Sequence, residues 1–84
     1  MTFTMYSTPW CGYCHRLKAT LERDGITFTE VDIEADRAAA ELVKDVNNGN
    51  ATVPTLLFAD GTTMTNPTAE AVRAKLAATL PMQP

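Results

Sequence analysis

Two cysteines separated by two residues are the side chains of this sequence best suited to covalent chemistry. Cys11 and Cys14 are the only cysteines in the chain. A disulfide between them would close too short a loop to cross-link distant segments. A Cys-x-x-Cys pair is typical of thiol–disulfide exchange, in which a thiolate attacks a disulfide sulfur. We therefore interpret the pair as a redox motif, in preference to a structural disulfide.

The spacing also predicts a different role for each sulfur. A helical pattern begins at about residue 12, with Leu17 and Leu21 one turn apart, so Cys14 falls on the apolar face one turn inside. Cys11 falls at the helix start, where unpaired N–H groups and the helix dipole favour the thiolate. Gly12 lets the backbone approach that sulfur. We expect Cys11 to attack and the more buried Cys14 to resolve.

The ionisation of Cys11 gives a first testable prediction. A thiol with a pKa of about 8.5 is about 3% ionised at pH 7, whereas one with a pKa of about 6 is about 90% ionised. That shift needs roughly 3.4 kcal/mol, and a helix terminus supplies at most about 2, so local N–H groups and the Cys14 thiol must supply the rest. We expect thiolate absorbance at about 240 nm to titrate below about pH 8; a midpoint of about 8.5 or above would contradict this.

Metal binding is the main chemical alternative. Cys11, Cys14 and His15 are the only Cys and His residues, so a closed four-ligand zinc site would need a carboxylate or a second chain. A dimer that holds an iron–sulfur cluster through Cys11 of each chain stays open, and a colourless monomer purified without oxygen would exclude it. No metal site is predicted as the primary role, and His15 is expected to be solvated.

Length and composition limit the remaining function classes. The chain has 84 residues, of which 45% are hydrophobic and 20% charged, so we expect one globular domain over 1–84 with a thin core. A net charge of −3 with seven Lys and Arg residues argues against nucleic acid or an anionic membrane as the partner. Neither a transmembrane run nor a secretory signal is visible, which favours a cytoplasmic location.

Four segments have the features of strands, and three have those of helices. The strands are expected at 3–6, 27–33, 54–58 and 62–64. The first helix stops at Gly25, and the second follows the acidic residues Glu34 and Asp36. Asn66-Pro67 is expected to start the third helix as N-cap and first-turn proline, and 81–84 to fray. The apolar stripes of the last two helices are Ala39, Leu42, Val43 and Val46, and Ala69, Val72, Leu76 and Leu80.

This order predicts an α/β sheet with helices on both faces. The first strand, helix and second strand form a βαβ unit with two parallel strands and a right-handed crossover. The turn at Asp60-Gly61 predicts a hairpin that adds two antiparallel strands to the same sheet. Val53-Pro54 opens the third strand, and the spacing leaves the cis and trans forms open.

Taken together, these motifs resemble those of the glutaredoxin family of the thioredoxin fold, over essentially the whole chain. Within that family the sequence is most similar to the mycoredoxins, which work with mycothiol instead of glutathione. The segments that carry the resemblance are Trp10-Cys11-Gly12-Tyr13-Cys14, Val31-Asp32-Ile33-Glu34, Arg37-Ala38-Ala39-Ala40-Glu41, Thr52-Val53-Pro54-Thr55, and Phe58-Ala59-Asp60-Gly61 continuing to Thr65-Asn66-Pro67. The implied fold is a four-stranded mixed sheet flanked by three helices, in the order β-α-β-α-β-β-α.

The resemblance also implies the members of a site. Cys11 is the implied nucleophile and Cys14 the resolving thiol, while Pro54 is the implied cis-proline. Val53 would offer backbone hydrogen bonds to a bound thiol. The implied substrate-binding residues are Trp10, Gly12, Tyr13, Thr52, Val53, Pro54, Thr65 and Asn66. Partial burial is the competing interpretation for Trp10, and a spacer role is the competing one for Tyr13.

Two departures from the glutaredoxin pattern favour mycothiol as the small thiol. The usual Gly-Gly-x-x-Asp is replaced by Thr65-Asn66-Pro67-Thr68, and Ser7-Thr8-Pro9 stands where a lysine often precedes the first cysteine. Glutathione has two carboxylates that such groups would bind, whereas mycothiol is a largely neutral pseudodisaccharide. The implied partners are therefore mycothiol, mycothiolated or disulfide-bonded proteins, and an NADPH-using mycothiol disulfide reductase. No cofactor need be bound, and a monomer is expected.

One rival mechanism needs both sulfurs. A thioredoxin-like redoxin would reduce protein disulfides with both cysteines and be recharged by thioredoxin reductase. In the mycothiol-dependent cycle only Cys11 is essential, so Cys14→Ser separates the two mechanisms.

Overall fold

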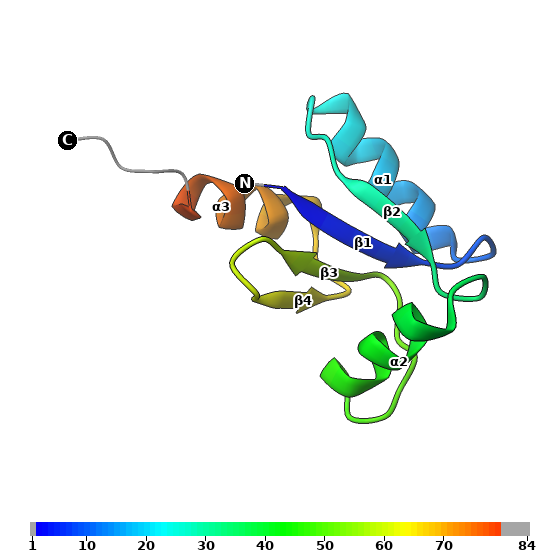
Figure 1. The fold of residues 1–84 in the computed structure, drawn as a ribbon. Helices are drawn as coiled ribbons and strands as arrows, with labels where there is room; N and C mark the ends of the chain where they lie inside the picture. The colour runs from blue at the N-terminus through cyan, green and yellow to red at the C-terminus, as the bar shows by residue number, and fades with distance from the viewer. Residues whose placement is uncertain (1, 80–84) are drawn as a thin grey trace.

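Alternating strands and helices build the computed structural model, which describes residues 2–79 (Figure 1). In chain order the elements are β1 (Phe3–Ser7), α1 (Gly12–Arg23), β2 (Thr29–Asp32), α2 (Arg37–Val46), β3 (Thr55–Phe58), β4 (Thr63–Thr65) and α3 (Ala69–Thr79). The predicted order of strands and helices is confirmed. The second strand is shorter than expected, because Thr27 and Phe28 precede the first residue that pairs with β1.

The four strands form one mixed sheet in the order β2-β1-β3-β4. β1 runs parallel to β2, whereas β1 with β3 and β3 with β4 are antiparallel. Tyr6 is opposite Thr55, and Thr55 is opposite Thr65. The register therefore brings the end of β1, the start of β3 and the end of β4 to one edge of the sheet.

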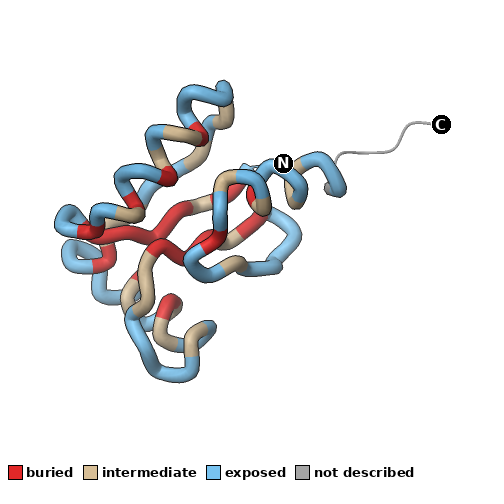
Figure 2. Tube along the Cα trace, turned by 180° about the vertical axis from the view of Figure 1, so that it is seen from behind, coloured by how far each residue is buried: buried red, intermediate tan, exposed pale blue. Residues whose placement is uncertain are grey.

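Apolar side chains pack on both faces of this sheet. α1 and α2 lie on opposite sides of it in Figure 1. On one face, β1 and β3 pack against α1 and α3, and the buried residues there are Phe3, Met5, Leu17, Leu21, Leu56, Phe58 and Val72. On the other face they pack against α2, where the buried residues are Tyr6, Ile33, Ala39 and Val43. Figure 2 shows the same burial along the central strands and the inner sides of the helices.

The start of the third helix differs from the sequence expectation. α3 begins at Ala69, two residues after Pro67, and Thr68 is its cap: the Thr68 hydroxyl accepts a hydrogen bond from the Ala71 N–H at 3.0 Å. Asn66 has a φ of 53° and therefore lies in the left-handed region, unlike the extended backbone of an N-cap. The Asn66 N–H instead donates to the Pro54 carbonyl at 2.8 Å.

Two apolar stripes are confirmed with one exception. Val46 ends the stripe predicted for α2, yet it is 39% exposed, whereas Val43 is fully buried. Val72 is buried in α3, with Ala69 and Leu76 packed against the same cluster. The predicted stripe residue Leu80 and the tail 81–84 lie outside the described residues.

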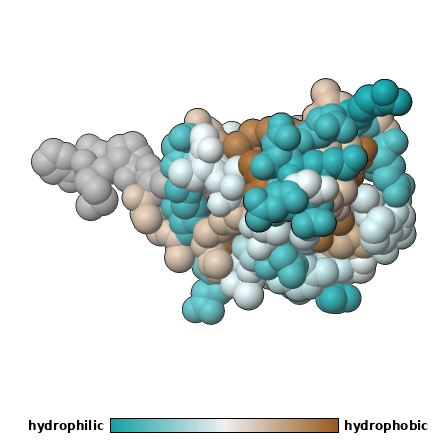
Figure 3. Space-filling model, turned by 90° about the horizontal axis from the view of Figure 1, so that it is seen from below, coloured by the Kyte–Doolittle hydropathy of each residue, from teal (hydrophilic) through white to brown (hydrophobic). Residues whose placement is uncertain are grey.

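One face of the molecule shows how polar and apolar residues share the surface. Figure 3 shows hydrophilic residues over much of the face seen from below, with hydrophobic surface between them. In the described part of the chain, no helix has the length and apolar character needed to cross a bilayer.

A charged turn closes the β3–β4 hairpin and gives a prediction about pH. Hydrogen bonds from the Thr62 hydroxyl and N–H to Asp60 Oδ1, at 2.6 and 3.0 Å, and from Lys75 to Oδ2, at 2.9 Å, hold the pKa of the Asp60 carboxyl well below its usual range. A pKa lowered by folding stabilises the folded state above the unfolded value of 3.8, and that stabilisation is lost as the pH falls below it.

We therefore expect Asp60→Asn to be less stable than the parent chain at neutral pH, and the difference to shrink below about pH 4. Urea unfolding of both proteins at about pH 7, 4 and 2.5 measures this. A difference that stays constant over the whole range would contradict the prediction.

Candidate active site

The residues predicted to do chemistry converge at one edge of the sheet. The Cys-x-x-Cys segment follows β1, the Val53-Pro54 segment precedes β3, and Thr65-Asn66 ends β4. Because Tyr6, Thr55 and Thr65 are aligned by the strand register, these three segments leave the sheet side by side. Parallel pairing also places the loop after β2 at this edge, since Ser7 is opposite Asp32.

Cys11 is the N-cap of α1, as the sequence predicted. It has the extended backbone of a cap residue, and its sulfur accepts a hydrogen bond from the Cys14 N–H at 3.0 Å. Cys11 and Cys14 are joined as a disulfide. Cys14 is 1% exposed and Cys11 is 8% exposed, so the outer sulfur is the more accessible of the two.

This geometry favours negative charge on the sulfur of Cys11. A backbone N–H of the first helical turn points at the sulfur, and the positive end of the helix dipole lies beside it. Both interactions stabilise a thiolate more than a thiol once the disulfide is reduced. Cys11 is therefore the sulfur of the pair better placed to act as nucleophile and leaving group.

The Val53–Pro54 peptide bond is cis, the form that the resemblance implied. Pro54 is buried and Val53 is half-buried against the α2 cluster. Thr52 lies just before them, and its carbonyl accepts a hydrogen bond from the buried Thr55 hydroxyl at 2.8 Å. The Thr52-Val53-Pro54 segment is thus held to β3 and, through the Asn66 N–H, to the residue after β4.

Tyr13 connects the redox helix to the segment before α3. Its hydroxyl donates to the Pro67 carbonyl at 2.8 Å, and its ring packs against the core. The Arg16 guanidinium lies 5.6 Å from the ring centroid. Tyr13 therefore links α1 to the segment before α3, in addition to separating the two cysteines in the sequence.

Thr65 and Asn66 are exposed at the end of β4. The Thr65 hydroxyl donates to Asn47 Oδ1 at 2.7 Å. The Asn47 side-chain nitrogen donates to the Val43 carbonyl at 2.9 Å and to the Thr55 hydroxyl at 3.1 Å. One amide thus ties the end of α2 to both strands of the hairpin, and no local sequence signal indicated it.

Removal of the Asn47 amide gives a prediction about stability. Asn47→Ala leaves the Val43 carbonyl and the Thr55 and Thr65 hydroxyls without these partners, so we expect it to cost about 1–3 kcal/mol of unfolding free energy. Asn47→Asp keeps the acceptor for Thr65 but loses both donors. Urea unfolding should therefore rank it between the parent and Asn47→Ala at neutral pH, and equal stability of all three would refute the role.

Trp10 and His15 differ from their sequence expectations. Trp10 is 70% exposed, so the interpretation of ordinary partial burial is wrong. Its indole N–H donates to Glu34 Oε2 at 2.6 Å, across 24 residues of sequence. His15 is exposed, but its Nε2 lies 2.7 Å from the Pro9 carbonyl, so it is bonded to the redox loop as well as solvated.

An open hollow of about 300 Å³ lies beside the loop that joins β1 to α1. It is lined by Ser7, Thr8, Pro9, His15, Lys18, Glu30 and Asp32. Lys18 donates to Glu30 at 2.7 Å, and this hydrogen bond is the main reason why the pKa of the Glu30 carboxyl is lowered. The Thr8 hydroxyl is buried and has no hydrogen-bond partner among the residues that the structure describes. Over those same residues, no cluster of three or more His, Cys, Asp and Glu side chains could hold a metal ion.

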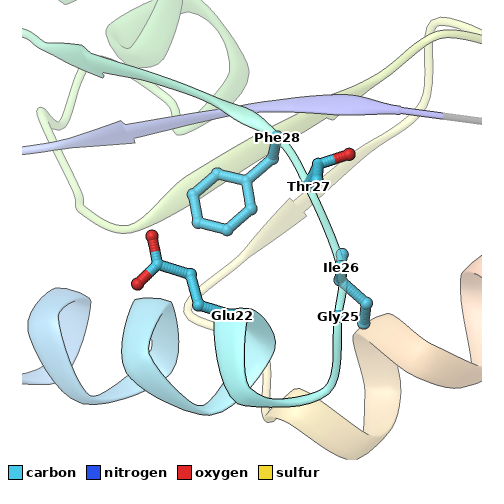
Figure 4. A pocket seen from close by; sticks show the side chains of 5 residues that line it. All are labelled: Glu22, Gly25, Ile26, Thr27 and Phe28. Atoms are coloured by element: carbon cyan, nitrogen blue, oxygen red, sulfur yellow. The ribbon is translucent and has the colours of Figure 1, made fainter.

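A second open hollow, of about 260 Å³, lies at the other end of α1. It is lined by Glu22, Gly25, Ile26, Thr27 and Phe28, and Figure 4 shows Glu22 and Phe28 extending between the helix and the chain that leads into β2. Cys11 caps the opposite end of this helix. The second hollow is therefore not part of the candidate site.

Comparisons with known proteins agree with this geometry. The glutaredoxin family model matches residues 3–63. The chain is 62% identical over 73 residues to a protein of Mycobacterium tuberculosis that is named as a glutaredoxin, with 87% of each chain covered. It is 47% identical over 75 residues to Mycoredoxin 1 of Corynebacterium glutamicum, over 89% of this chain and 92% of that protein. In fold it resembles NrdH-redoxin of Escherichia coli, with a TM-score of 0.74 at 20% identity, over 99% of this chain and 100% of that one.

Proposed function

The chain belongs to the glutaredoxin family and is a thiol–disulfide oxidoreductase with the pair Cys11–Cys14, and on that premise we propose that it reduces mixed disulfides between proteins and mycothiol. The observation that carries the proposal is the Cys11 sulfur at the cap of α1, hydrogen-bonded to the Cys14 N–H at 3.0 Å. That contact supports a thiolate at Cys11, the less deeply buried residue of the pair.

The proposed reaction consists of two thiol–disulfide exchanges. The Cys11 thiolate attacks the mycothiol sulfur of a protein–mycothiol disulfide, and the protein thiolate leaves and takes up a proton. A second mycothiol, as thiolate, attacks the mycothiol sulfur now bound to Cys11. Mycothiol disulfide forms, and the Cys11 thiolate is regenerated. Closure of the Cys11–Cys14 disulfide is then a side reaction of the mixed disulfide.

The surrounding segments would hold the small thiol. The exposed pair Thr65 and Asn66 offers uncharged polar groups, and Val53 offers its backbone beside Pro54. The 47% identity to a protein named Mycoredoxin 1 supports mycothiol as that thiol. The full set of proposed substrate-binding residues is Trp10, Gly12, Tyr13, Thr52, Val53, Pro54, Thr65 and Asn66.

The proposal extends to the partners of the chain. Electrons would come from NADPH through a separate mycothiol disulfide reductase, so the domain of residues 1–84 would need no resident cofactor. We also propose that it acts as a monomer in the cytoplasm. Its other partners would be mycothiolated or disulfide-bonded proteins.

A dithiol reductant of protein disulfides is the second candidate function. The observation that favours it is that the two sulfurs are close enough to form the Cys11–Cys14 disulfide, which such a reductant must close in each cycle. Thioredoxin reductase would then recharge the pair.

A coupled assay tests the proposed function. NADPH oxidation is followed with a mycothiolated peptide, mycothiol and mycothiol disulfide reductase, and then with the glutathione mixed disulfide, glutathione and glutathione reductase. We expect turnover in the first system and much slower turnover in the second. Turnover with the glutathione system alone would overturn the assignment of mycothiol and leave the family assignment in place.

A further inference from the structure

An exposed indole stands directly before the nucleophile and is held in place. Trp10 is the only tryptophan of the chain, and it keeps 70% of its surface exposed. A ring so exposed would sample several rotamers if only packing held it, but its N–H donates to the Glu34 carboxylate at 2.6 Å. The exposed ring of the residue that precedes Cys11 is therefore available to a partner at little further cost in side-chain entropy.

Glu34 in turn is positioned by the turn after β2. The Glu34 N–H donates to Asp32 Oδ1 at 2.8 Å, and the Ala35 N–H donates to the Asp32 carbonyl at 3.1 Å. The Ile33 N–H donates to the Ser7 carbonyl at 3.0 Å, which ties the turn to the end of β1. The Glu34 carboxylate, on a turn held by hydrogen bonds, thus sets the orientation of Trp10 in the neighbouring loop between β1 and α1.

The turn that carries Glu34 is mostly acidic. Asp32, Glu34 and Asp36 lie within five residues of one another, and Arg37 is the one cation that directly follows them. The Glu34 carboxylate accepts the indole N–H through Oε2. An aromatic face attracts Lys and Arg, tryptophan most strongly, and an adjacent carboxylate attracts them further.

We propose that Trp10 and Glu34 form a recognition surface for the polypeptide side of the mixed disulfide, and that this surface favours cysteines flanked by a basic residue. The proposal rests on the proposed function, which supplies a protein disulfide to the Cys11 sulfur. The cation of the flanking residue would lie on the indole and near the carboxylate. Glu34 is a positioning residue for Trp10 and also selects by charge.

Three mycothiolated peptides that differ only in the residues beside cysteine test this surface: one with lysine, one with glutamate and one with serine. We expect kcat/KM at low ionic strength to be about fivefold higher for the lysine peptide than for the glutamate peptide. Salt should reduce that ratio, because the charges are exposed. Glu34→Gln keeps an oxygen acceptor for the indole but removes the charge, so it should reduce the ratio to about twofold.

Glu22→Gln is the matched control, because it makes the same change in net charge at the far end of α1 (Figure 4). It should keep the ratio of the parent chain. Equal ratios in Glu34→Gln, Glu22→Gln and the parent, or no preference in the parent, would overturn the proposal.

The fluorescence of the single tryptophan reports on the surface without turnover. Glu34→Ala should raise acrylamide quenching and lower the anisotropy of Trp10, while Glu34→Gln should change both less. Titration of the peptides against Trp10 emission gives their relative affinities. If no mycothiolated peptide is turned over, the proposed function fails. The recognition surface fails separately if those affinities do not depend on the flanking charge or on Glu34.

Discussion

Replacement of Cys14 by serine is expected to leave the mycothiol-dependent cycle within about threefold of the parent rate, whereas replacement of Cys11 by serine should lower it by about a thousandfold or more. The hydrogen bond to the Cys11 sulfur comes from the backbone N–H of residue 14, which serine retains. Neither exchange of the mycothiol-dependent cycle uses the Cys14 sulfur as nucleophile or leaving group; that sulfur closes the internal disulfide. Cys11 supplies the sulfur that attacks in the first exchange and leaves in the second.

Both variants should fold, which keeps the comparison interpretable. Serine is a preferred N-cap residue, so Cys11→Ser preserves the cap of α1. Serine is also close to cysteine in size at the buried position 14. Circular dichroism and urea unfolding check this, and the coupled assay gives the rates.

The outcome separates the two candidate functions. Loss of turnover in Cys14→Ser, with a folded protein, would show that the internal disulfide is obligatory. The dithiol cycle recharged by thioredoxin reductase would then replace the mycothiol-dependent one, and the family assignment would stand.

Local patterns were enough to predict the elements of this fold and the two cysteines of the site. Strand composition, helical periodicity and the Asp60-Gly61 turn each act over a few residues, so the sequence contains them directly. The cap at Cys11 follows from its place before a helical stripe, and the contact of its sulfur with the Cys14 N–H confirms the expectation. Val53-Pro54 was visible as a motif, although its cis form came only from the resemblance.

Contacts between distant segments could not be predicted in this way. Trp10 contacts Glu34 only because β1 and β2 are parallel and end together. Neither residue type predicts this contact. Asn47 looks like an ordinary helix-ending residue until β3 and β4 lie beside it.

The start of α3 and the exposure of Val46 show a related limit of sequence patterns. Asn66-Pro67 has the composition of a helix start, but the Asn66 N–H donates to the Pro54 carbonyl. The cap of the helix is Thr68 instead. Val46 continues a helical stripe, but α2 ends at that residue and the sheet covers Val43 instead. Periodicity fixes the face of a helix and does not fix how far the neighbouring sheet extends along it.

Phe58→Ala is expected to have the largest effect on stability. Phe58 is 2% exposed, its ring lies 5.2 Å from that of Phe3, and Lys75 Nζ lies 5.5 Å from its centroid. Truncation of a buried phenylalanine typically costs about 3–5 kcal/mol, because transfer energy and cavity formation add. Small domains have a total stability of about 5–15 kcal/mol, so this one change should remove much of what holds the protein folded.

The effect should reach the candidate site through β3. Phe58 ends the strand that begins at Thr55, directly after Pro54, so loss of its ring weakens the packing of the strand that follows the Val53-Pro54 segment. Phe58→Leu, which refills most of the volume, should lie between the parent and Phe58→Ala in urea midpoint. Val46→Ala is the control for loss of apolar side chain at an exposed position and should stay within about 0.5 kcal/mol of the parent. If Phe58→Ala and Val46→Ala unfold at the same urea concentration, the Phe58 ring does not contribute to the stability of the core, and the packing described for β3 is wrong.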